Sequence, residues 1–239
     1  MVVSGSGSPV TVAAHGFGAS IAETRPLLSG VPGTKVFYEA RGHGSARPPE
    51  QAGYDELADD LDRVAASHGA TQALGVSLGA HTVLRLLCRV PDRFAKAVLF
   101  LPAALDTPPV RREGLAAALA AGDRERVLAW VRAELPPGRD TEAYAAARTS
   151  YLLSSAGLRQ LLEGLTEAPV PDLSRLAAVT ADVLVLAQEG DPVHPAGVGR
   201  QLAAALPSAS LVVFERPGVL WNERARLRSL VIGHLGEGD

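Results

Sequence analysis

The chain has 239 residues, of which 47% are hydrophobic and 21% are charged, and its formal net charge is −3. This length suits one α/β domain with an inserted subdomain, and the composition is that of a globular protein with a large core. The small net charge gives no electrostatic case for nucleic acid or an anionic membrane as a partner. A single cysteine, Cys88, excludes an internal disulfide and any multi-cysteine metal site.

The segment MVVSGSGSPV at the start of the chain has no basic region and no long apolar region, so it does not resemble a signal peptide. Its first eight residues are expected to be flexible. No stretch approaches 18 uninterrupted apolar residues, which argues against a membrane span. We therefore expect a cytoplasmic protein.

The predicted elements alternate between strands and helices along the chain. Apolar runs typical of buried strands cover residues 9–14, 34–40, 71–76, 95–103, 182–188 and 210–214. Helical spacing covers residues 54–67, 78–90 and 222–235. This alternation, with strands that are apolar almost throughout, predicts an α/β fold: a mostly parallel sheet with helices on both faces.

Residues 107–172 break this alternation. They predict three or four helices rich in Ala and Leu, separated by the proline-containing stretches PPV, LPPGRD and APVPDL. So long a helical segment between two sheet strands indicates an inserted cap. The predicted division is therefore a core of residues 1–106 and 173–239, with a helical cap over 107–172.

The stretch ALGVSLGAH (73–81) carries the strongest functional signal. Ser77 lies between Gly75 and Gly79, with a predicted strand before it and a predicted helix after it. A G-x-S-x-G sequence in this context is the nucleophile elbow, a tight turn that exposes a serine hydroxyl. A serine is a weak nucleophile on its own and needs a neighbouring base.

With this motif the chain resembles the α/β-hydrolase superfamily, and the resemblance covers nearly all of it. HGFGAS (15–20) is similar to that family's oxyanion loop, RGHGSA (41–46) to its next loop, and EGDPVHP (189–195) to its acid loop. The resemblance implies that Asp191 is the triad carboxylate and that 107–172 is the lid. It also implies an esterase, a lactonase or a carbon–carbon bond hydrolase.

Two backbone amides are expected to form the oxyanion hole. Leu78 follows the serine at the start of a helix, where the helix dipole also favours negative charge. Phe17 supplies the second amide from the loop after the first strand. His15, in the same loop, is expected to support the loop by hydrogen bonds.

The expected base is missing from its usual place. In the superfamily a histidine follows the last strand, but this chain has FERPGVLWNERARL there, with Val219 at the histidine position. His194, three residues after Asp191, His81, one helical turn after Ser77, and His43 are candidate substitutes. Sequence reasoning does not choose among them.

Three functions therefore stay open: hydrolysis of a small, mostly apolar ester, thioester or lactone with a non-standard base; a non-hydrolytic step, such as cyclisation, dehydration or lyase chemistry, on a natural-product intermediate; and ligand binding without catalysis. Trp130 and Tyr151 of the cap and Trp221 of the core are candidate pocket residues. In each case the expected partner is a small molecule, with no cofactor and no metal, and a homodimer is left open.

Overall fold

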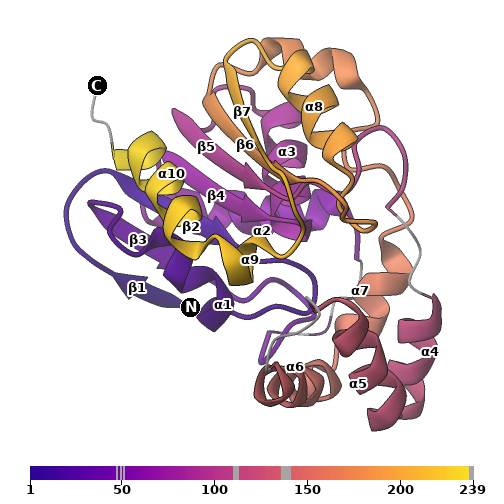
Figure 1. Ribbon diagram of the computed structural model, residues 1–239. Helices are drawn as coiled ribbons and strands as arrows, with labels where there is room; N and C mark the ends of the chain where they lie inside the picture. The colour runs from indigo at the N-terminus through magenta and orange to yellow at the C-terminus, as the bar shows by residue number, and fades with distance from the viewer. Residues whose placement is uncertain (47, 49, 51, 110–112, 136–140, 237–239) are drawn as a thin grey trace.

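The computed structural model describes residues 1–46, 48, 50, 52–109, 113–135 and 141–236. In this part of the chain one seven-stranded sheet has the order β1-β3-β2-β4-β5-β6-β7 (Figure 1). Its strands are β1 (Val2–Ser4), β2 (Val10–Ala14), β3 (Thr34–Phe37), β4 (Gln72–Val76), β5 (Lys96–Phe100), β6 (Asp182–Gln188) and β7 (Ala209–Phe214). Every neighbouring pair is parallel except β1 with β3. The α/β class with a mostly parallel sheet is thus confirmed.

Helices cover both faces of the sheet. The core helices are α1 (Ile21–Thr24), the 3-10 helix η1 (Arg25–Leu28), α2 (Tyr54–Ser67), α3 (Leu78–Arg89), the 3-10 helix η2 (Leu173–Ala178), α8 (Ala196–Ala205), α9 (Val219–Asn222) and α10 (Arg224–Gly236). Apolar residues of α2, α3 and α8 form one buried cluster with one side of the sheet. Residues of η1, α9 and α10 form a second cluster on the other side. The two clusters account for strands that are apolar on both faces.

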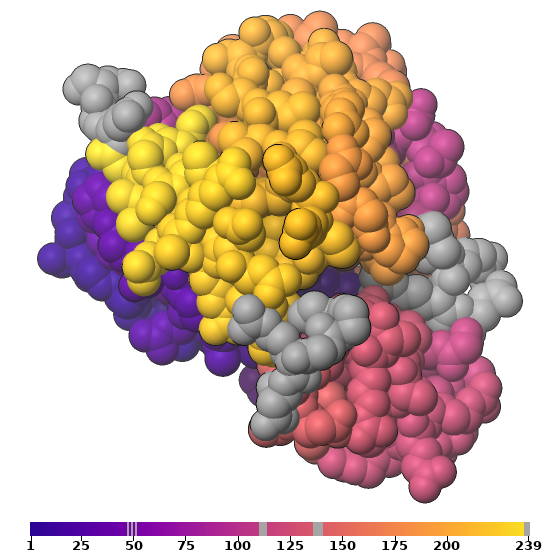
Figure 2. Space-filling view, viewed as in Figure 1, coloured from indigo at the N-terminus to yellow at the C-terminus, as the bar shows by residue number. Residues whose placement is uncertain are grey.

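Among the described residues of the insert there are four helices: α4 (Glu113–Ala121), α5 (Arg124–Ala133), α6 (Glu142–Ser154) and α7 (Leu158–Gly164). They make a lobe beside the core, seen in magenta to salmon in Figures 1 and 2. Their buried side chains, including Leu115, Val127, Leu152 and Leu158, join the core cluster on the α3 face of the sheet. The cap is therefore packed on the core and not only tethered to it. In the described ranges no helix has the length and apolarity needed to cross a membrane.

Two local predictions need correction. The first residues are not a flexible tail, because Val2–Ser4 form β1, which pairs antiparallel with Phe37–Lys35 at the edge of the sheet. The helix predicted over 222–235 is α10 (Arg224–Gly236), and a separate short helix that was not predicted, α9 (Val219–Asn222), precedes it.

The strand register brings the functional loops together. Ala14 of β2 pairs with Gly75 of β4, Val76 pairs with Phe100, and Phe100 pairs with Leu186 of β6. Because these strands are parallel, the loops that follow β2, β4 and β6 leave the sheet at one edge. Binding sites of open α/β sheets form at this carboxyl edge.

Candidate active site

Ser77 sits on a strained turn between β4 and α3. Its φ of 51° and ψ of −109° are unusual for a residue with a side chain, and its amide donates to the Phe100 carbonyl over 2.9 Å. A Cβ on Gly75 would collide with the Gly79 carbonyl, and one on Gly79 would collide with the Ala14 carbonyl. Both glycines are therefore needed for the turn to form against β2. This is the geometry that a nucleophile elbow requires.

The acid loop after β6 brings a histidine to this serine. His194 Nε2 lies 3.0 Å from Ser77 Oγ, and His194 Nδ1 lies 2.9 Å from Asp191 Oδ2. Because a carboxylate only accepts hydrogen bonds, Nδ1–H donates to Asp191 and Nε2 is left to accept from the serine hydroxyl. The described chain thus has a continuous hydrogen-bonded series from carboxylate to serine, although no histidine stands at position 219.

A tight turn explains how one short loop supplies both groups. Asp191 Oδ1 accepts from the amides of Val193 and His194, at 2.8 and 3.0 Å. This side-chain-to-backbone turn, which Asp forms readily, directs the His194 side chain back over the carboxylate. Burial alone raises the pKa of Asp191, but the hydrogen bonds from His194 and Gln188 outweigh it, so the pKa lies below its usual value.

Gln188, the last residue of β6, is a site residue that sequence analysis did not select. It is buried, and its Nε2 donates to Asp191 Oδ2 over 2.5 Å. Its Oε1 accepts from the amide of Val219 over 3.1 Å. Gln188 is therefore hydrogen-bonded both to Asp191 in the acid loop and to Val219, which follows the loop after β7. The sequence signal was a polar residue that ends an otherwise apolar strand.

Val219 is the first residue of α9 and packs in the cluster beneath α10, where its residue surface is 1% exposed. Gly218 before it has φ 85°, so the backbone turns directly into this helix. Position 219, where the sequence analysis expected a histidine, thus holds an apolar side chain that belongs to the core.

The loop after β2 is supported by two buried histidines. His15 Nε2 accepts from the Ala40 amide, and its Nδ1–H donates to the Gly16 carbonyl. His43 Nε2 accepts from the Gly18 amide at 2.9 Å, and its ring packs edge-on against His15. Burial lowers the pKa of both, that of His43 to about 3 with a further contribution from His15. Both are therefore neutral supports of the loop.

His81 also lies away from the serine oxygen. Its Nε2 accepts from the amides of Ala103 and Ala104, at 3.0 and 3.1 Å, and its Nδ1 lies 3.3 Å from the Tyr54 hydroxyl. Both ring nitrogens are thereby engaged with the loop after β5 and with α2. Of the three candidate bases, the structure brings only His194 within hydrogen-bonding distance of Ser77.

Leu78 directly follows Ser77, and Phe17 follows Gly16, which lies against the Ser77 side chain. Leu78 is the first residue of α3, and its amide has no acceptor among the described residues. The Phe17 carbonyl accepts from Arg148 Nη2 of the cap over 3.3 Å. Together with the Gly18–His43 bond, this contact holds the Phe17–Gly18 peptide from both sides.

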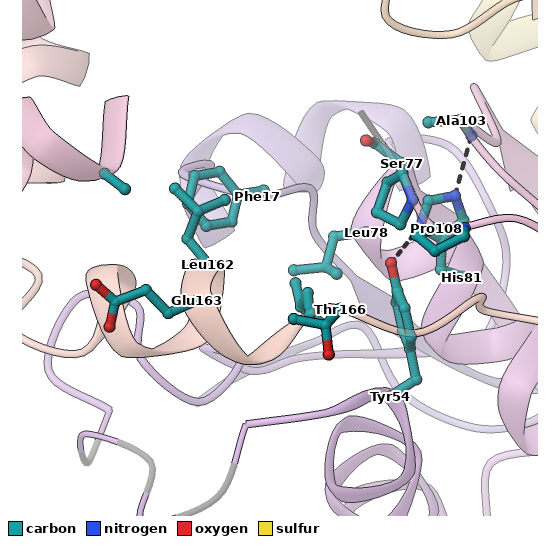
Figure 3. A pocket seen from close by; sticks show the side chains of 13 residues that line it. Phe17, Tyr54, Ser77, Leu78, His81, Ala103, Pro108, Leu162, Glu163 and Thr166 are labelled. Atoms are coloured by element: carbon teal, nitrogen blue, oxygen red, sulfur yellow. Dashed lines mark hydrogen bonds between the residues drawn. The ribbon is translucent and has the colours of Figure 1, made fainter. Parts of the chain in front are cut away.

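Two cavities open onto Ser77. One of about 590 Å³ is lined by the acid loop, by Gln188 and Val219, by Trp221 and by cap residues that include Tyr144 and Arg148. The other, of about 250 Å³, lies toward α2, α4 and α7 (Figure 3). Of the aromatic pocket candidates, Trp221 lines the larger cavity. Trp130 and Tyr151 line neither: Trp130 packs against the core cluster, and the Tyr151 hydroxyl donates to Glu39 over 2.7 Å.

The chain is similar to a known family and to many solved structures. The model of the alpha/beta hydrolase family matches residues 10–228. An enol-lactonase from Burkholderia xenovorans superposes with a TM-score of 0.85 at 20% identity, over 99% of this chain and 95% of that one. An esterase from Exiguobacterium antarcticum gives a TM-score of 0.84 at 19% identity, over 99% and 94%.

A meta-cleavage product hydrolase from Pseudomonas fluorescens has a TM-score of 0.81 at 19% identity, over 100% of this chain and 94% of the other. None of the curated protein sequences matches this chain. At these identities the solved structures establish the fold. The family match, which spans most of the sequence and includes the elbow and the acid loop, establishes membership. The chain belongs to the alpha/beta hydrolase family.

Proposed function

We propose that this protein hydrolyses small, mostly apolar esters, thioesters or lactones, with Ser77 as nucleophile, His194 as general base and Asp191 as its carboxylate partner. The observation that carries the proposal is the pair of contacts on one imidazole, 3.0 Å to Ser77 Oγ and 2.9 Å to Asp191 Oδ2. The roles of nucleophile, base and orienting carboxylate require this order of contacts. Asp191 and His194 come from one loop instead of two, which is a non-standard form of the triad.

Acylation uses the groups in that order. Ser77 Oγ attacks the substrate carbonyl carbon while its proton passes to His194 Nε2. The carbonyl oxygen becomes an oxyanion, which the amides of Phe17 and Leu78 stabilise. The Asp191 carboxylate, with its lowered pKa, stays ionised and stabilises the imidazolium.

Collapse of this intermediate breaks the bond to the leaving oxygen or sulfur, which takes the proton from His194 Nε2. Water then attacks the acyl-serine carbonyl, again with His194 as base. The acyl–oxygen bond to Ser77 breaks, the serine regains its proton, and the carboxylic acid leaves. The similar enol-lactonase and esterase folds support this choice of reaction.

Labelling with a fluorophosphonate, followed by intact mass, tests the proposal. We expect one phosphonyl group per chain on the folded protein, none on Ser77→Ala, and labelling slowed by about a hundredfold or more in His194→Ala. The same variants should lose p-nitrophenyl ester hydrolysis in parallel with their loss of labelling. A folded wild type that neither labels nor hydrolyses would contradict the proposal and favour a non-hydrolytic or ligand-binding protein.

A further inference from the structure

Ser77 lies where the two cavities meet. Ser77 and Phe17 line both of them, and the other lining residues are separate. Figure 3 shows the smaller cavity, with Ser77, His81 and Tyr54 on one side and Phe17 and Leu162 on the other. A substrate carbonyl at Ser77 would therefore have one substituent in each cavity.

The position of His194 determines which substituent of the substrate carbonyl lies in which cavity. His194 is among the residues that line the larger cavity and is not among those that line the smaller one. When the tetrahedral intermediate collapses, the leaving atom must take its proton from His194 Nε2, which requires hydrogen-bonding distance. The leaving group consequently lies in the larger cavity, which leaves the smaller one for the acyl substituent.

The smaller cavity has the chemistry of an apolar binding site. Its walls include the apolar residues Leu78, Ala103, Pro108, Ala116 and Leu162. Its buried polar groups, Tyr54 and His81, are already hydrogen-bonded to each other or to backbone amides. No lysine or arginine is among the described residues that line it, and the exposed Glu163 pairs with Arg159. Among these described residues, a charged acyl group that lost its hydration would find no counter-charge.

The larger cavity differs from the smaller one in having charged, polar and aromatic side chains in its walls. It includes Tyr144 and Arg148, which contact each other at 2.8 Å and both contact Glu23, together with the indole of Trp221. Such mixed polar and aromatic walls suit a bulkier leaving group with hydroxyl or carbonyl substituents.

We propose that the cavity lined by Leu78, Ala116 and Leu162 is the acyl pocket and that it selects uncharged, medium-length acyl groups. This inference rests on the proposed function. The smaller cavity has a volume of about 250 Å³. At about 30 Å³ for each group of the size of a water molecule, it has room for about eight non-hydrogen atoms. The specificity constant should therefore rise by about fourfold per methylene up to about eight carbons, and then fall.

The test is Ala116→Leu on α4, assayed with p-nitrophenyl esters from acetyl to dodecanoyl. The larger side chain fills the pocket, so the octanoyl ester should lose about tenfold in kcat/KM while the acetyl ester stays within about threefold. Ala117→Leu is the matched control, because Ala117 is the next residue of α4, is exposed and lines neither cavity. It should keep the wild-type chain-length profile.

The outcomes separate the two proposals. Ala116→Leu protein that labels at Ser77 and hydrolyses acetyl esters, with an unchanged chain-length profile, would overturn the acyl-pocket assignment and leave the hydrolase proposal in place. A preference for succinyl over butyryl esters would also overturn it. A wild type without Ser77 labelling would remove both proposals.

Discussion

The loops after β6 and β7 are neighbours at the same edge of the sheet, but their contents differ. The loop after β6 contains Asp191 and, three residues later, His194 within hydrogen-bonding distance of Ser77. The loop after β7 contains no histidine and leads into α9, whose first residue, Val219, is buried in the core. Because β6 and β7 are paired in parallel, both loops leave the sheet at the edge where Ser77 lies. The histidine that contacts Ser77 thus comes from the loop after β6, while the sheet keeps the order of the fold.

The largest expected effect comes from removing the imidazole of the loop after β6. His194→Ala should lower kcat by about a thousandfold or more, because the serine would have no base. Steady-state hydrolysis of a p-nitrophenyl ester measures this loss, with thermal unfolding as the check on folding. His68→Ala is the control, since His68 follows α2 at the opposite edge of the sheet. Activity of His194→Ala close to that of the wild type would show that the base lies elsewhere.

Gln188 connects the two loops, so its removal tests whether they act together. Gln188→Leu deletes the bond to Asp191 and leaves the Val219 amide without its side-chain acceptor. We expect kcat to fall by about tenfold, and the free energy of unfolding to fall by about 1–3 kcal/mol.

The two losses are measured separately, by ester hydrolysis and by urea unfolding. Gln188→Glu is the comparison variant: it keeps an acceptor for the Val219 amide but places a second carboxylate against Asp191. Because the two like charges repel, it should lower kcat more than Gln188→Leu does. Equal catalysis by all three proteins would mean that the turn at Asp191 holds the carboxylate without Gln188.

Much of the site could be predicted from the sequence because it depends on local backbone. The elbow needs Gly75 and Gly79 beside Ser77 for steric reasons, and a carboxylate after an apolar strand lies at the carboxyl edge. The same reasoning predicted the sheet and the helical insert, since both depend on apolar periodicity.

The choice of base could not be made in this way. His194, His81 and His43 all lie near the correct edge, and they differ only in their partners. His43 and His81 accept backbone amides from loops far away in sequence, which no local pattern reveals. The short-range signal for His194 was the spacing in DPVH, where an Asp turn directs the fourth residue back over the first.

The next variant places a histidine at position 219, the first residue of α9. If His194 is the base, Val219→His should give no gain in kcat, because a base already contacts Ser77. The polar imidazole would replace an apolar side chain in the core, at a cost of about 1–3 kcal/mol in the free energy of unfolding. Ester hydrolysis and urea unfolding measure the two effects. A rise in kcat of about tenfold or more would show that the standard position is still the better one.

The smallest expected effect concerns His15 and His43 in the loops after β2 and β3, which are fully buried, whereas His194 is only partly buried. The pKa of His43 is about 3 in the folded protein, below its ordinary value of 6.5. Between these values the unfolded chain binds a proton at this position and the folded protein does not, so acidification favours unfolding. From pH 7 to 5.5 this histidine should lower the free energy of unfolding by about 1 kcal/mol. His43→Gln keeps an acceptor for the Gly18 amide without a titrating group, so urea unfolding at the two pH values should show a smaller loss. The same loss in both proteins would mean that His43 is protonated in the folded state, which the bond from the Gly18 amide to its Nε2 opposes.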